Sequence, residues 1–172
     1  MPPAAPKARV FWPIFILWLV LDLITKQLAL AYLWPPGIPH QVVGDYVRLT
    51  LAFNRGAAMG MSLGEWSRPA FTVIAIVLLG AMGWLYRRTD ASNRIQGAVL
   101  AFIAAGAVGN LIDRIRHARG VTDFIDLGIG NVRFWTFNVA DMGITLGAIA
   151  LAFTMKEVEG GRRRSKRVEE VL

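Results

Sequence analysis

The chain has 172 residues, of which 55% are hydrophobic and only 18% are charged, and its net charge is +7. A soluble domain usually carries about 25% charged residues. Here the apolar residues gather in blocks of roughly 20, the length that crosses a bilayer core, so an ordinary soluble globular protein is excluded. The absence of cysteine excludes a disulfide scaffold, a cysteine nucleophile and a thiolate metal site.

Four apolar blocks are each long enough to cross a membrane as a helix. A helix satisfies its own backbone hydrogen bonds, which lipid cannot do. We therefore predict an all-α membrane protein with four transmembrane helices in a single domain, residues 1–155, followed by a basic tail over residues 156–172. The predicted spans are residues 10–33, 69–86, 95–112 and 137–155.

The first apolar block carries two charged residues at membrane depth. Its basic flank and the sequence Ala29-Leu30-Ala31 resemble a cleavable signal peptide, but Asp22 and Lys26 interrupt the apolar run, so we expect a retained helix. The two residues lie four positions apart with the acid first, which favours an ion pair. A charge at this depth costs roughly 2.5–3.5 kcal/mol. The pair either holds the bundle together or supports a substrate or a catalytic loop.

The two long loops contain short strand patterns. Apolar residues occupy every second position of residues 47–54, as in a half-buried strand, and Gly44-Asp45 can turn this strand back onto residues 41–43. The second loop repeats the alternation and ends at Gly130-Asn131. The alternating residues are Val47, Leu49, Leu51 and Phe53 in the first loop, and Ile125, Leu127 and Ile129 in the second. We expect a small β element on the outer face of the membrane.

The third apolar block combines small residues with a polar end. The small residues recur every four positions, which allows close helix packing, and they are Gly97, Ala101, Ala105 and Gly109. Next come Asn110, Asp113 and Arg114, whose spacing puts them on one helix face near the outer boundary. An arginine–carboxylate arrangement there either supports the structure or contacts a polar ligand.

Two acidic residues lie close to the start of the fourth block. Asn138 is placed as an N-cap, and Asp141 three residues later completes a capping box, so a structural role is one interpretation. The other interpretation pairs Asp141 with Asp123, for which Asp126 is a competing candidate. Neighbouring carboxyl groups cannot easily both ionise. The ionised one can deprotonate water and the protonated one can polarise a carbonyl, so that a peptide is hydrolysed without a metal.

Basic residues predict the orientation of the chain. They are denser in the N-terminal segment, in the turn after the second block and in the tail than in the two long loops. Since the denser side is normally cytoplasmic, we expect both termini inside and the long loops outside. We assign the basic run at residues 162–167 to anionic lipid head groups rather than to nucleic acid.

Five short motifs, taken in chain order, resemble those of the lipoprotein signal peptidase family (signal peptidase II). The resemblance covers nearly the whole chain, from Asp22 to about Gly147. The motifs are Asp22-Leu23-Ile24-Thr25-Lys26, Asn54-Arg55-Gly56-Ala57-Ala58, Gly106 with Gly109-Asn110-Leu111-Ile112-Asp113-Arg114, Gly120-Val121-Thr122-Asp123-Phe124-Ile125-Asp126, and Phe137-Asn138-Val139-Ala140-Asp141. Met59 departs from the family, which often has Phe after the Ala-Ala pair, and this leaves the fit of ligands open.

The resemblance implies an aspartic endopeptidase of the bacterial inner membrane, without cofactor or metal. Its substrate would be a prolipoprotein carrying diacylglycerol, cut just before the lipidated cysteine. The implied fold is four membrane helices with a small extracytoplasmic β cradle, and the site lies near the extracytoplasmic face. The other implied partners are membrane lipid and globomycin-type inhibitors. The implied residues are Asp123 and Asp141 as the catalytic pair, Asn54, Gly56, Asn110, Asp113, Arg114 and Asn138 as shapers of the site, and Asp22 and Lys26 in support.

Two other functions compete with this interpretation. A magnesium-dependent membrane phosphotransferase would need a denser acidic cluster than these helices carry, because no apolar block holds more than one acid. A non-enzymatic carrier subunit would line a path through the bilayer with polar residues. Here all but Asp22 and Lys26 gather toward one boundary, which favours a boundary site over a path.

Overall fold

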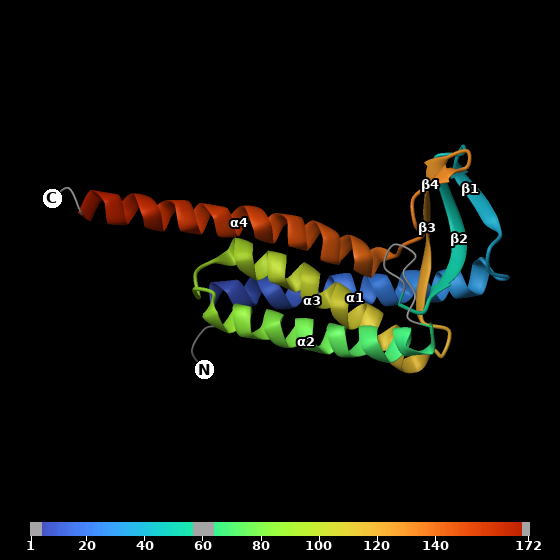
Figure 1. Cartoon of the computed structure of the whole chain (residues 1–172), viewed down its shortest axis with the longest axis horizontal. Coiled ribbons are helices and arrows are strands. Elements are labelled where there is room, and N and C mark those ends of the chain that lie inside the picture. Colours follow the sequence, from blue (N-terminus) through green and yellow to red (C-terminus); the bar gives the residue numbers. More distant parts are fainter. Residues whose placement is uncertain (1–4, 57–63, 170–172) are drawn as a thin grey trace.

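The computed structural model describes residues 5–56 and 64–169, and Met59 lies outside these described residues. Four helices run lengthwise and a small sheet stands across one end of them, while α1 begins and α4 ends at the other end (Figure 1). The helices are α1 (Pro6–Tyr32), α2 (Ser67–Arg88), α3 (Arg94–Arg116) and α4 (Val139–Glu169), with a 3₁₀ turn η1 (Gly64–Trp66) before α2. The strands are β1 (Pro39–Val43), β2 (Val47–Asn54), β3 (Val121–Ile129) and β4 (Val132–Arg133).

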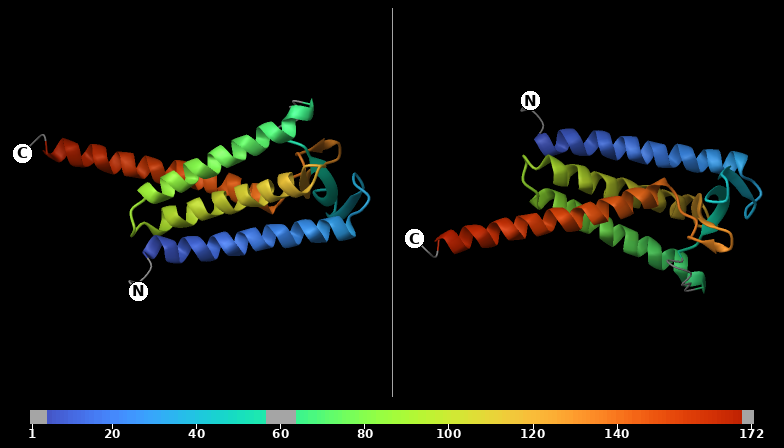
Figure 2. Two further views of the ribbon diagram at one scale, coloured as in Figure 1. Left: turned by 90° about the horizontal axis from the view of Figure 1, so that it is seen from below. Right: turned by 90° about the horizontal axis from the view of Figure 1, so that it is seen from above.

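Three helices of the described chain are long and apolar enough to cross a membrane, namely α1, α2 together with η1, and α3. The apolar part of α4, Val139–Thr154, is shorter. The helix itself continues to Glu169, through most of the predicted tail, because helical backbone needs no apolar side chains to propagate. Seen from two further sides, α4 packs on α3 near the sheet and diverges from the bundle toward its end (Figure 2).

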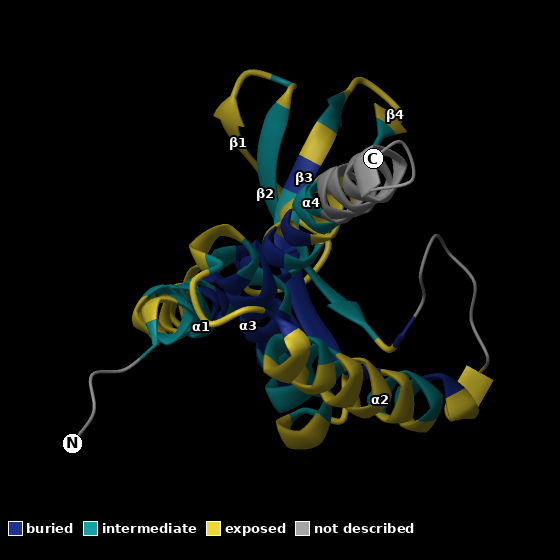
Figure 3. Cartoon of the chain, turned by 90° about the vertical axis from the view of Figure 1, so that its left-hand side faces the viewer, coloured by how far each residue is buried: buried dark blue, intermediate teal, exposed yellow. Residues whose placement is uncertain are grey.

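Helix α3 lies at the centre of the bundle. It is more buried than α1 or α2, and α2 is mostly exposed (Figure 3). The small residues of α3 permit this central position, because a Cβ on Gly106 would collide with the carbonyl of Ala140 in α4, and a Cβ on Gly109 would collide with Asp22 in α1. An exposed apolar helix such as α2 is stable only where lipid or another protein covers it.

The four strands form one antiparallel sheet in chain order. The predicted hairpin is present as β1 and β2, and Ala52 of β2 lies opposite Asp123 of β3. Strand β3 begins at Val121, earlier than the alternation from Ile125 indicated. Its first four residues are all buried, so they lack the alternation by which a half-buried strand is recognised.

The sheet is fixed to the bundle by an apolar core at their junction. Leu51 of β2, Phe124 of β3 and Val139 of α4 are buried against the end of α1. Trp18 of α1 adds a polar contact there, because its indole N–H donates to the carbonyl of Val139 at 3.1 Å. The beginning of α4 therefore sits between α1, α3 and β3, and its position is set by all three.

We predict that Gly106→Ala lowers the thermal stability of the purified protein by about 1–3 kcal/mol, because the added methyl group overlaps backbone of α4. Gly80→Ala in α2 is the matched control, since a Cβ there meets nothing within 4 Å and alanine favours a helix over glycine. Unfolding is measured in detergent. Equal stability of the two variants would contradict the close α3–α4 approach.

Candidate active site

The side chain of Asn138 joins the start of α4 to its own first turn. Asn138 directly precedes the helix and is fully buried. Its Oδ1 accepts from the backbone N–H of Asp141 at 2.9 Å, and Oδ2 of Asp141 accepts from the backbone N–H of Asn138 at 3.2 Å. This is a reciprocal capping box, and it confirms the N-cap predicted from the sequence.

The same asparagine also contacts the second predicted carboxyl group. Its Nδ2 donates to Oδ1 of Asp123 at 2.6 Å and to the carbonyl of Thr122 at 3.2 Å. Asn138 therefore donates to both carboxyl groups, to Asp123 on β3 from its side-chain amide and to Asp141 on α4 from its backbone N–H. The capping role of Asp141 and its proximity to Asp123 exist together, and the two interpretations of this residue do not exclude each other.

Asp123 lies in an environment that disfavours its charge. It is 2% exposed. Burial, followed by repulsion from Asp141, raises the pKa of Asp123 from 3.8 to about 7, although hydrogen bonds from Asn138 and Asn54 oppose the shift. Near neutral pH the pair can therefore hold one proton, the condition that a carboxyl pair needs to act as acid and base together.

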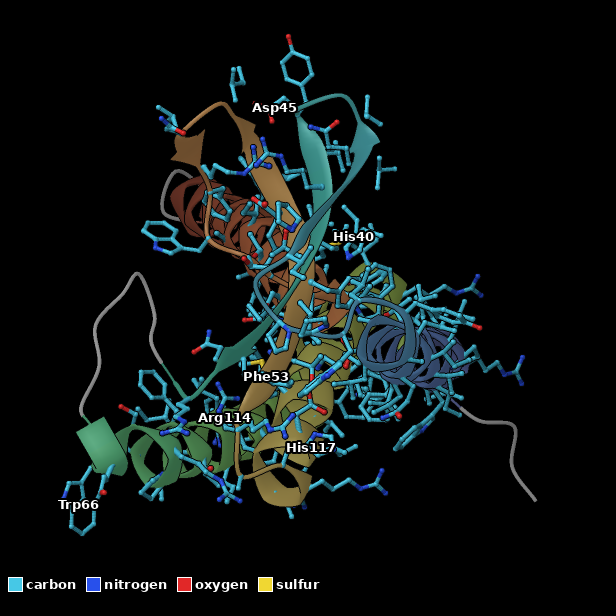
Figure 4. All side chains as sticks on the ribbon, turned by 90° about the vertical axis from the view of Figure 1, so that its right-hand side faces the viewer. His40, Asp45, Phe53, Trp66, Arg114 and His117 are labelled. Carbon is cyan, nitrogen blue, oxygen red and sulfur yellow. The ribbon has the colours of Figure 1, made fainter. Side chains whose placement is uncertain are left out.

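Asn110 and Arg114 of α3 complete the surroundings of Asp141. Nδ2 of Asn110 donates to Oδ1 of Asp141 at 2.8 Å. The positive charge of Arg114 acts on Asp141 and Asp123. Figure 4 shows Arg114 and His117 at the end of α3, where the sheet meets the bundle, and Asp45 at the far end of the sheet. Arg114 therefore adds positive charge near the pair.

A buried ionic cluster lies next to this site. Nζ of Lys26 pairs with Asp22 at 2.8 Å and with Asp113 at 3.4 Å, so the predicted ion pair within α1 is confirmed and extended to α3. Asp22 accepts from the backbone N–H of Ala140 at 2.9 Å, and Asp113 accepts from the backbone N–H of Thr122 at 2.9 Å. The cluster thus holds both backbone segments that carry the two carboxyl groups.

Gly56 lies at the end of β2, near the site. Its N–H donates to Oδ1 of Asn54 at 2.9 Å, and its φ of +120° belongs to a region that side chains disfavour. A Cβ there would also overlap the ring of Phe71. Gly56 therefore shapes the turn that presents Asn54 to Asp123.

Asp126, the competing candidate, is held elsewhere. It lies three residues beyond Asp123 on β3, so its side chain leaves the opposite face of the strand. Its carboxylate accepts from Nε of Arg133 at 2.6 Å and from the hydroxyl of Thr50 at 3.2 Å. Within the described ranges, no group of three or more His, Cys, Asp or Glu side chains is arranged to hold a metal ion. The site offers protons and hydrogen bonds.

An apolar cavity of about 310 Å³ opens beside Asp141. Its other lining residues are Phe134, Phe137, Met142, Thr145 and Leu146. We did not predict these residues from the sequence. Leu146 and Met142, four apart on α4, could have been recognised as one face with Asp141, but the two phenylalanines come from an irregular segment without a periodic pattern.

Comparison with known sequences gives one consistent family. A family model described as signal peptidase (SPase) II matches residues 14–156. A protein named lipoprotein signal peptidase from Maridesulfovibrio salexigens is 38% identical over 141 residues, which cover 80% of this chain and 89% of that one. One of the same name from Paraburkholderia phymatum is 32% identical over 163 residues, covering 93% and 96%.

Comparison with solved structures agrees. A structure described as a bacterial membrane enzyme, obtained by the in meso method at 2.3 Å resolution, superposes with a TM-score of 0.73 at 30% identity, covering 84% of this chain and 85% of that one. A second one, at 1.9 Å resolution, gives 0.70 at 31% identity, covering 83% and 89%. The arrangement of helices and sheet is therefore shared with solved membrane proteins.

We predict that Asp123→Asn stabilises the protein increasingly as pH rises. The folded-state pKa of about 7 exceeds 3.8, so wild type loses stability as pH rises through this range, whereas asparagine cannot ionise. The stability difference between the variant and wild type should grow by about 2–3 kcal/mol from pH 5 to pH 8. Thermal unfolding in detergent at both pH values measures it. A difference that does not change with pH would refute the raised pKa.

Proposed function

This chain belongs to the lipoprotein signal peptidase (signal peptidase II) family, and we propose that Asp123 and Asp141 are the carboxyl groups with which it cuts its substrate. As a member of the family it is a peptidase of the inner membrane that removes the signal peptide from prolipoproteins. Family membership favours this activity over a phosphotransferase or a carrier subunit. The observation that carries the proposal is that one residue, Asn138, donates to both carboxyl groups, to Asp123 from its side-chain amide and to Asp141 from its backbone N–H.

The proposed reaction transfers protons between the two carboxyl groups and the substrate. The carboxylate of Asp141 takes a proton from water, and the water oxygen bonds to the scissile carbonyl carbon while Asp123 gives its proton to the carbonyl oxygen. In the second step the C–N bond breaks. Asp141 then passes its proton to the leaving amine, and a hydroxyl of the intermediate returns a proton to Asp123. Both carboxyl groups thus return to the protonation states in which they began.

The surroundings of each carboxyl group suit its proposed role. Asp141 lies in the first turn of α4, where the helix dipole favours a negative charge, and it receives hydrogen bonds from Asn110 and Asn138. Asp123 is almost fully buried, which favours its neutral form. Arg114 adds positive charge near both, so negative charge that develops on the intermediate is stabilised.

We further propose how the protein sits in the membrane. The apolar part of α4 forms a fourth span beside α1, α2 and α3, so the domain of residues 1–155 is a four-helix unit with both termini in the cytoplasm. The sheet then lies at the extracytoplasmic face as a β cradle, with the site beneath it. The density of basic residues in the terminal segments supports this orientation.

The cavity beside Asp141 is the proposed binding place for apolar parts of the substrate. Its walls come from Phe134, Phe137 and α4, and it has a volume of about 310 Å³. We propose that a prolipoprotein carrying diacylglycerol enters from the bilayer, with its scissile bond just before the lipidated cysteine placed at the carboxyl pair. Globomycin-type inhibitors are proposed to occupy the same space, and membrane lipid to surround the remaining helices.

We predict that Asp123→Asn and Asp141→Asn each reduce cleavage of a diacylglyceryl prolipoprotein by about 10²–10⁴-fold or to below detection, because asparagine can neither accept nor deliver the required proton. Asp126→Asn is the matched control on the same strand and should retain activity. The purified proteins are compared in detergent or liposomes, with thermal unfolding to verify folding. Near-normal cleavage by either variant would remove that residue from the proposed pair.

We also predict that kcat/KM falls as pH rises above about 7. The reaction needs the protonated form of Asp123, whose pKa is raised to about 7, so each further pH unit should lower the rate about tenfold. A substrate without groups that titrate between pH 6 and pH 9 is required. A rate that stays constant to pH 9 would show that the proton on Asp123 is not used.

A further inference from the structure

Lys26 is a buried cation next to the proposed site. It is 1% exposed, and its ammonium group has three polar neighbours: Asp22 at 2.8 Å, Asn110 at 2.9 Å and Asp113 at 3.4 Å. An ammonium group has three N–H donors and no acceptor, so each donor finds one partner. Two of these partners are carboxylates and neutralise the charge. The third partner, Oδ1 of Asn110, is an uncharged acceptor.

The contact with Lys26 decides which way the amide of Asn110 faces. Because Lys26 can only donate, the carbonyl oxygen of Asn110 must point toward it, and the NH₂ group must point away. Nδ2 of Asn138 also donates to this oxygen, at 3.2 Å. The NH₂ group of Asn110 then donates to Oδ1 of Asp141 at 2.8 Å. The charge of Lys26 is thereby linked to Asp141 through one planar group.

We propose that Lys26 is a positioning residue of the peptidase, which holds the carbonyl oxygen of Asn110 so that the NH₂ group of the amide donates to Asp141, a contact that suits the carboxylate form needed to accept a proton from water. The inference rests on the proposed role of Asp141 as the base that activates water. Without Lys26 only the longer contact from Asn138, at 3.2 Å, holds this oxygen in place, so the amide of Asn110 turns over more easily. A carbonyl oxygen would then face Asp141 and favour its protonated form, which cannot accept a proton from water.

The charged groups around Asp141 come from all of the elements packed against it. Asp123 on β3 and Arg114 on α3 both interact with it electrostatically. On α1, Asp22 is paired with Lys26 and bonded to the backbone of α4. Arg114 is the other cation near the pair and does not contact the side-chain oxygen of Asn110, so it cannot replace Lys26 in setting the amide.

A double-mutant cycle separates this role from general support of the fold. Lys26→Met, Asn110→Ala and the double variant are compared with wild type for kcat, KM and the pH at which activity falls on the acidic side. We expect Lys26→Met to lower kcat by about 10²-fold, with little change in KM, and to move the acidic limb upward by about one pH unit. In the Asn110→Ala background, Lys26→Met should add little to either effect.

Additive effects of the two substitutions, or a reduced rate with an unmoved acidic limb, would overturn the proposal. If Lys26→Met does not fold, the cycle is repeated in the Asp22→Asn background, which removes one of the two carboxylates that lose their cation and leaves an oxygen for the N–H of Ala140. Cleavage by Asp123→Asn and Asp141→Asn, measured in parallel, tests the proposed function itself. If those variants are inactive and the cycle is additive, only the role of Lys26 is refuted.

Discussion

The first turn of α4 begins inside the protein, and a helix that begins in a buried place has N–H groups that need acceptors. The N–H of Ala140 finds its acceptor on another helix, in the carboxylate of Asp22. A buried carboxylate is costly without a cation, and Lys26 supplies one. The remaining donors of Lys26 require further acceptors, which are Asn110 and Asp113 on α3. The need to satisfy one helix start thus brings polar side chains from several elements to one point of an apolar protein.

This polar centre also explains the packing around it. α3 must approach both Asp22 and the backbone of Ala140, and only the missing side chains of Gly106 and Gly109 leave the room. Gly109 was predicted from the sequence as a helix-packing position, whereas Gly106 entered only through the family resemblance. Both glycines allow close packing, and the surfaces that they bring together carry the polar contacts of the site. Stability and the proposed chemistry therefore depend on the same few close approaches between helices. A substitution that weakens this packing should also impair the proposed site.

The sequence predicted those features that depend on neighbouring residues. The alternation over residues 47–54 predicted strand β2, and the spacing of Asn138 before Asp141 predicted where α4 begins. It did not predict the beginning of β3, because residues 121–124 are buried throughout and show no alternation. The contact of Asp22 with Ala140 joins residues 118 positions apart, and no local pattern reports such a distance. Resemblance to a family grouped these residues, but their hydrogen bonds had to come from the structure.

The bonds of Asn138 have a mechanical consequence for the proposed pair. Its side-chain amide donates to the carboxyl group of Asp123 and accepts from the backbone N–H of Asp141, and its own backbone N–H donates to the carboxyl group of Asp141. The two carboxyl groups therefore cannot separate widely while these three bonds hold. Entry and exit of a large, lipid-bearing substrate are then best accommodated by other parts of the molecule, while Asn138 keeps the reacting groups close to each other.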